Sequence, residues 1–150
     1  MYIADMHCDT IMKIWFSHRG GKPLHLKDTE KSYEELMIDL SKLKIGGSLV
    51  QNFAIFIDLA LPEGFNGENG TSGILSSVAE TAGKLSPWTQ FNEMAKIYHE
   101  EIAANSDIIR EALSYEDIEA NKNEGLISSV LTIEEGGVLE GDTDRLQTLY

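Results

Sequence analysis

Apolar and polar positions divide the chain into two kinds of segment. Residues 48–57 and 126–133 are apolar at most positions and rich in β-branched or aromatic side chains. Runs of this kind are typical of parallel strands buried on both faces. The shorter, mixed segment 2–9 is predicted to form a further strand close to the N-terminus.

Between these strands the apolar residues recur at helical spacing. The pattern predicts helices over 32–44, 86–105 and 114–123, and a fourth that begins near Asp142 or Thr143. Capping signals support three of the starts: Ser32 with Glu35, Ser86-Pro87, and Ser114 with Asp117.

Two segments lack either pattern. Residues 17–28 contain glycine and proline breakers, and residues 58–73 are rich in glycine, so both are predicted to be irregular. The remaining order is strand, helix, strand, helices, strand, helix. Strands that alternate with helices predict an α/β fold with a parallel sheet.

Composition narrows the class of protein. The 150 residues contain 12 Lys and Arg against 25 Asp and Glu, a net charge of −13 that argues against binding nucleic acid or anionic membranes. The single cysteine, Cys8, excludes an intrachain disulfide and indicates a reducing compartment. We find no membrane-spanning run and no signal peptide, and therefore expect a cytoplasmic protein.

The first candidate for chemistry is His7 with Asp9. Residues two apart on a strand point to the same side, so the imidazole and the carboxylate would converge while Cys8 faces the other way. Nitrogen from His and oxygen from Asp both suit Zn²⁺, at about 2.0–2.2 Å. The pattern alone also allows a histidine that is merely half-buried at a strand end.

The second candidate is the segment 134–137, Glu-Glu-Gly-Gly, which follows the apolar run 126–133. Sites in parallel α/β folds collect at the carboxyl ends of strands, so His7, Asp9 and Glu135 are expected on one rim. Such a set would form a hydrolase-type metal site, in which a carboxylate can bridge two cations. The alternative at this stage is a pair of solvated glutamates.

Three stretches, IADMHCDT, LKIGGSLVQNFAIFI and SSVLTIEEGGVLEGD, resemble the membrane dipeptidase (renal dipeptidase) family, the M19 zinc metallopeptidases. The resemblance runs in order along the whole chain. It implies that His7 and Asp9 are ligands of the first zinc. It also implies that Glu135, which directly precedes the glycines, is the bridging and catalytic carboxylate, and that Glu134 points elsewhere.

The resemblance also implies an activity and a fold. The family hydrolyses the peptide bond of dipeptides through a metal-activated hydroxide, tolerates a D-residue on the C-terminal side, and folds as a TIM-like (β/α)₈ barrel. We therefore expect a dipeptide substrate and two zinc ions in the complete enzyme, with one or none in this chain. The family's later histidines, Arg and Asp have no counterpart here. His18 and His25 are expected to be solvated, and His99 to lie exposed or half-buried on a helix.

Length conflicts with that fold, because a (β/α)₈ barrel needs about 250 residues. About three βα units are present, so we expect residues 1–150 to be the N-terminal part of a single metallo-dependent hydrolase barrel domain. It would be inactive alone and would be completed by a missing C-terminal half or by homo-oligomer formation. Two alternatives are another metal-dependent amidohydrolase, acting on a cyclic amide or ester, and a non-catalytic assembly module.

Overall fold

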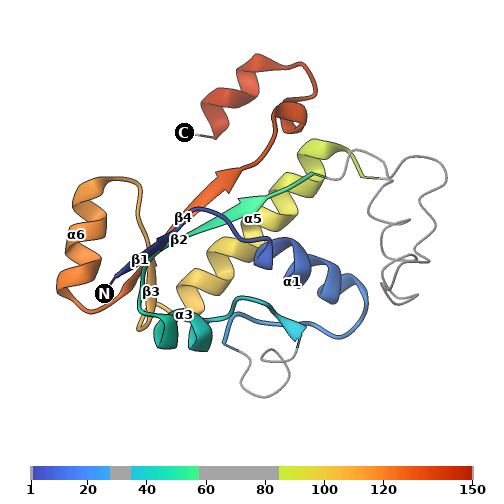
Figure 1. Cartoon of the computed structure of the whole chain (residues 1–150). Helices are drawn as coiled ribbons and strands as arrows, with labels where there is room; N and C mark the ends of the chain where they lie inside the picture. Colours follow the sequence, from blue (N-terminus) through green and yellow to red (C-terminus); the bar gives the residue numbers. More distant parts are fainter. Residues whose placement is uncertain (1, 28–34, 58–84, 150) are drawn as a thin grey trace.

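Four parallel strands form the centre of the structure, a computed structural model that describes residues 2–27, 35–57 and 85–149 (Figure 1). The first elements are β1 (Ile3–Asp5), α1 (Thr10–Arg19), α3 (Leu40–Gly46) and β2 (Ser48–Ile55). They are followed by α5 (Pro87–Ala104), β3 (Ile109–Glu111), α6 (Tyr115–Asn123), β4 (Ile127–Ile133) and the 3-10 helices η1 (Gly136–Leu139) and η2 (Thr143–Thr148).

The strands lie in the order β1-β2-β4-β3, and each neighbouring pair is parallel. The pairing of β2 with β4 is the longest and runs from Val50 opposite Ser128 to Ile55 opposite Ile133. Because all the strands run the same way, their carboxyl ends meet at one rim of the sheet. At that rim β1 and β4 lie on either side of β2.

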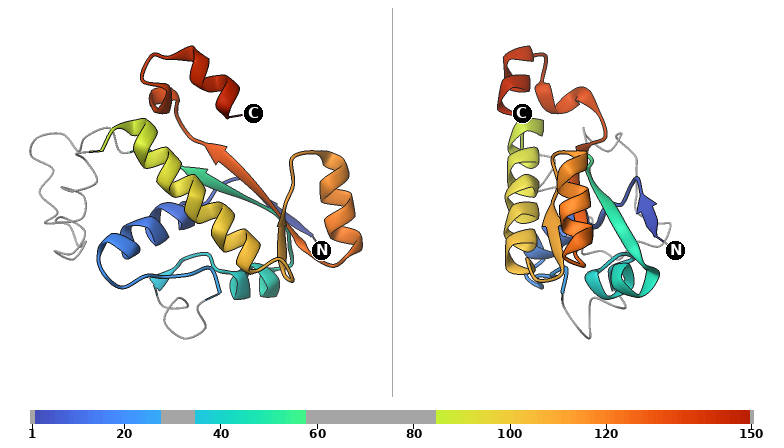
Figure 2. Two further views of the ribbon diagram at one scale, coloured as in Figure 1. Left: turned by 180° about the vertical axis from the view of Figure 1, so that it is seen from behind. Right: turned by 90° about the vertical axis from the view of Figure 1, so that its left-hand side faces the viewer.

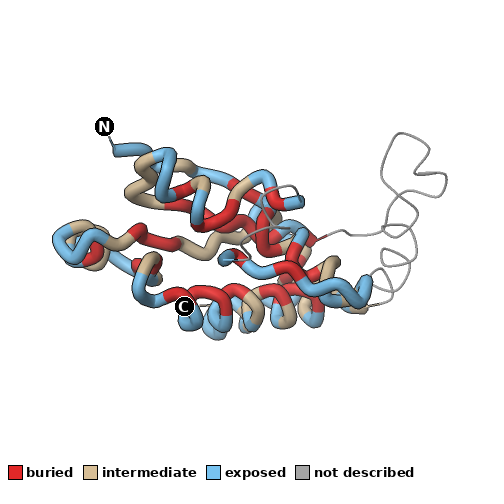
Figure 3. Tube along the Cα trace, turned by 90° about the horizontal axis from the view of Figure 1, so that it is seen from below, coloured by how far each residue is buried: buried red, intermediate tan, exposed pale blue. Residues whose placement is uncertain are grey.

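Helices α1 and α5 pack against each other and against β2, and α5 runs along one face of the sheet (Figure 2). Tyr98 of α5 is fully buried there, with its ring 5.9 Å from that of Phe53 on β2. The Ser129 hydroxyl of β4 donates to the Tyr98 oxygen at 2.7 Å. Buried positions lie where the elements face one another, and exposed positions lie on the outer turns (Figure 3).

The α/β fold with a parallel sheet is confirmed. The apolar runs 48–57 and 126–133 form β2 and β4, and the predicted helices 86–105 and 114–123 form α5 and α6. Two of the predicted caps are present: Ser86 accepts a hydrogen bond from the Thr89 amide, and Ser114 accepts one from the Asp117 amide.

The predicted helix over 32–44 is not continuous: Glu35 is helical, but residues 36–39 are not, and only the shorter helix α3 follows. Helix α3 begins at Leu40, because Asp39 has an extended backbone (φ −140°, ψ 172°) and its side chain accepts from the Lys42 amide at 2.9 Å. The proposed cap Ser32 lies outside the described residues. The helix does end at the predicted glycines, with Gly47 in the left-handed conformation (φ 72°) that glycine adopts most readily.

Other boundaries also differ from the prediction. Helix α1 occupies Thr10–Arg19 and so overlaps the segment 17–28 that was predicted to be irregular, and the short strand β3 was not predicted at all. The first strand ends at Asp5, and the fourth helix is the 3-10 helix η2. The predicted loop 58–73 lies outside the described residues. No helix in the described ranges is both long and apolar enough to cross a membrane.

Candidate metal centre

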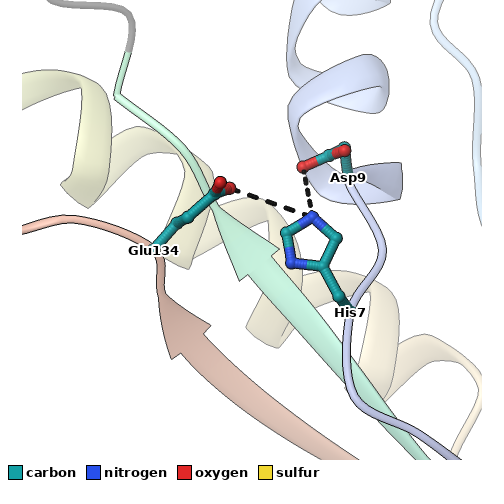
Figure 4. A group of neighbouring side chains, drawn as sticks. All are labelled: His7, Asp9 and Glu134. Carbon is teal, nitrogen blue, oxygen red and sulfur yellow. Dashed lines mark ion pairs between the residues drawn. The ribbon is translucent and has the colours of Figure 1, made fainter.

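The rim formed by the carboxyl ends of β1 and β4 carries a cluster of three side chains (Figure 4). His7 and Asp9 come from the segment between β1 and α1, and Glu134 directly follows β4. One nitrogen of His7, Nε2, lies 3.2 Å from Asp9 Oδ1 and 3.8 Å from Glu134 Oε2. The imidazole therefore stands between two carboxylates.

Backbone pairing with β2 holds the first two members in place. The amide of Cys8 donates to the Asn52 carbonyl at 3.1 Å, and the Ala54 amide donates to the Cys8 carbonyl at 2.9 Å. Cys8 points into the core and is 7% exposed. His7 and Asp9, one residue to either side, point to the opposite face, as the sequence predicted.

Glu134 is positioned by the last step of the β2–β4 ladder. Its amide donates to the Ile55 carbonyl at 3.1 Å, one residue beyond the end of β4, where the chain bends. The preceding side chain, Ile133, packs against the core. The side chain of Glu134, the next residue, is 44% exposed and faces His7.

Ion pairing stabilises this cluster only weakly. The side chains of His7, Asp9 and Glu134 are 49%, 50% and 44% exposed, and exposed ion pairs contribute only about 0–1 kcal/mol to stability. With neutral histidine, the cluster carries two negative charges and one free nitrogen lone pair. This arrangement is suited to holding a cation.

The donor set fits zinc. His nitrogen and carboxylate oxygen are both normal zinc ligands, and two ligands of a tetrahedral zinc at about 2.1 Å are roughly 3.4 Å apart. The two contacts to His7, at 3.2 and 3.8 Å, lie on either side of that value. All three ligand atoms lie within 4.8 Å of one another. The residues can therefore converge on one ion with only small side-chain adjustments.

Glu135 is placed differently from what the sequence predicted. Its backbone turns at the start of η1, and its Oε2 accepts a hydrogen bond from the Gly137 amide at 2.7 Å. The structure does not bring it together with His7 and Asp9 in the cluster, and the expectation that Glu134 points elsewhere is wrong. Whether Glu135 binds metal stays a prediction. The alternation of strand residues through Ile133 was the signal that could have identified Glu134.

The other histidines lie outside this cluster. His18 and His25 are exposed, and their rings are 5.6 Å apart; His25 also pairs with the carboxylate of Glu101 at 2.6 Å. His99 is exposed on α5, as predicted, and lies 3.6 Å from Glu111.

A parallel α/β sheet with a His, Asp and Glu cluster on the rim at its strand ends is the arrangement expected in metal-dependent hydrolases with a (β/α)₈ barrel. A family model described as membrane dipeptidase, peptidase family M19, matches residues 1–150, and the chain belongs to that family. The family is one of metal-dependent dipeptidases, generally zinc-dependent, with a TIM-barrel fold. No curated protein sequence matches the chain.

Proposed function

We propose that this chain carries the first-metal half of the active site of a zinc dipeptidase. The observation that supports the proposal is the convergence of Asp9 and Glu134 on Nε2 of His7 at the ends of β1 and β4. His7 would offer a nitrogen, and the two carboxylates would offer oxygens and balance the charge of the ion. When bound, zinc polarises a peptide carbonyl and activates water for its hydrolysis.

The chain's own residues hold the cluster in place and leave it open to a substrate. The ladder bonds of Cys8 and Glu134 to β2 hold the two sides of the cluster at a fixed separation. The side chains are about half exposed, so the carbonyl of a small substrate can approach them from solvent. A dipeptide with an L- or D-residue at its C-terminal side is the substrate we propose, from family membership.

The rest of the barrel is the second part of the proposal. Within the described ranges, β1 and β3 form the two edges of a sheet of four strands, whereas the family barrel has eight. Tyr2, Ile3 and Met6 are exposed at the β1 edge, and open strand edges tend to pair. We propose that further strands, or another copy of the chain, complete the barrel and supply the second zinc site. Light scattering of the purified chain would separate these two routes.

Metal analysis tests the proposal. Zinc content of the purified chain should be about one ion per chain and should fall to background in His7→Ala. The matched control is His99→Ala, which removes another exposed histidine paired with a carboxylate. Zinc that survives His7→Ala, or is equally lost in His99→Ala, would contradict the proposed site.

Activity tests the substrate class. The completed enzyme should hydrolyse dipeptides and lose that activity in His7→Ala. Hydrolysis of cyclic amides or lactones in place of dipeptides would favour another amidohydrolase. A stable, defined oligomer with neither zinc nor hydrolysis would favour an assembly module.

A further inference from the structure

We infer that Glu135 is a positioning residue, which holds the turn after β4 so that its neighbour Glu134 faces His7. The inference rests on the proposed function, because it assigns Glu135 a task at the same metal site. It concerns a charged group next to Glu134 in the sequence that the proposed ligand set leaves unused.

The first step is the cap that Glu135 makes. Its backbone is extended (φ −147°, ψ 156°), and its Oε2 accepts the Gly137 amide at 2.7 Å. This is the geometry of an N-cap residue, which satisfies an amide at the start of a helix that has no partner within the helix. The bond therefore determines where the chain leaves the strand and begins to turn.

The second step is that the turn is anchored on its far side. Val138, at the centre of η1, is 1% exposed and belongs to the hydrophobic core, and η1 packs against α5. The Glu134 amide is anchored on the near side by the Ile55 carbonyl. The Glu135 cap lies between these two anchors, so its loss would free the backbone that aims the Glu134 carboxylate.

The described residues show the same kind of N-cap bond at η2, a place without site residues. Asp142 is the N-cap of η2, and its Oδ1 accepts the Asp144 amide at 3.0 Å, again two residues onward. A shorter carboxylate therefore makes this bond in the same protein. Asp142 supplies both the reason to expect rescue by aspartate at position 135 and a matched control.

One oxygen atom of Glu135 is consistent with the alternative role, in which Glu135 is itself a metal ligand. Oε1 of Glu135 is buried and has no hydrogen-bond partner among the described residues, so it is the atom a metal would use if Glu135 were a ligand. A glutamine at this position can still accept the Gly137 amide but loses the negative charge. Glu135→Gln therefore separates the two roles.

The experiment measures zinc affinity and amide exchange in the full chain for Glu135→Ala, Glu135→Gln, Glu135→Asp and Asp142→Ala. We expect Glu135→Ala to lose about 10–100-fold in zinc affinity, the usual effect of losing an outer-shell partner, and Asp and Gln to stay within about tenfold of wild type. Asp142→Ala should leave zinc affinity unchanged. Equal losses in the Ala and Gln variants would show that Glu135 is a ligand and would overturn the inference.

Amide exchange distinguishes failure of this inference from failure of the proposed function. If the wild-type chain binds no zinc, the proposed function fails, but the Gly137 and Glu134 amides still report on the turn. Both amides should exchange faster in Glu135→Ala and at the wild-type rate in Glu135→Asp. Wild-type exchange in the Ala variant would overturn the positioning role whether or not zinc binds.

Discussion

The Glu134 carboxylate lies 3.8 Å from Nε2 of His7, although the strands that precede these two residues are separated in the sheet by β2. The contact is possible because the parallel strands end at one rim and because the Glu134 amide bonds to the Ile55 carbonyl just beyond β4, which keeps Glu134 beside β2. Two short segments from opposite ends of the chain thus form one cation-binding cluster.

Replacing Tyr98 with Phe should destabilise the sheet from the helix side. The substitution leaves the Ser129 hydroxyl, which is fully buried, without the acceptor it has at 2.7 Å. An unsatisfied buried hydroxyl costs about 1–3 kcal/mol. Urea unfolding should show this loss, and the double variant with Ser129→Ala should recover part of it. An unchanged midpoint of urea unfolding in Tyr98→Phe would show that the hydrogen bond between Ser129 and Tyr98 does not stabilise the fold.

Alkaline pH should lower the free energy of unfolding through the ionisation of Tyr98. Burial raises the pKa of Tyr98 above its ordinary value; nearby Glu111 adds to the rise and the hydrogen bond from Ser129 opposes it. The unfolded chain therefore ionises first, near pH 10, so this group's contribution is complete below pH 10 and is lost as the pH rises above it. Stability measured from pH 8 to 11 should fall less steeply in Tyr98→Phe; equal slopes would contradict the prediction.

The buried carboxylate of Glu101 should matter more than its exposed partner. Glu101 is 6% exposed, and it accepts from the Leu26 amide at 2.8 Å and pairs with His25 at 2.6 Å. Glu101→Ala leaves a buried amide unpaired, at a cost of about 1–3 kcal/mol. His25→Ala should cost less than about 1 kcal/mol because the His25 side chain is half exposed. Thermal unfolding of both variants would compare the two losses of stability. A larger loss in His25→Ala than in Glu101→Ala would contradict the prediction.

The sequence was most informative where one physical signal dominated. Continuous apolar character identified β2 and β4, and Ser86 before Pro87 identified the start of α5. Helix α1 was missed although Asp9, a preferred N-cap residue type, precedes it, and β3 was missed because three residues are too few to show a period.

At the metal site, too, the sequence predicts some residues and not others. His7 and Asp9 could be predicted because their spacing fixes a shared side. The choice between Glu134 and Glu135 could not be made from adjacency to the glycines. It depends on how the chain turns after β4, where the Glu134 amide bonds to Ile55 and Glu135 caps η1.

The most direct test of the metal site is the zinc affinity of Glu134→Gln, measured by titration beside the wild-type chain and Glu135→Gln. Loss of a first ligand should weaken binding by more than about 100-fold, beyond the usual effect of an outer-shell partner, while Glu135→Gln stays within about tenfold. Circular dichroism should show all three proteins equally folded. Wild-type affinity in Glu134→Gln, together with loss of zinc in Glu135→Gln, would contradict the assignment of Glu134 to the metal site.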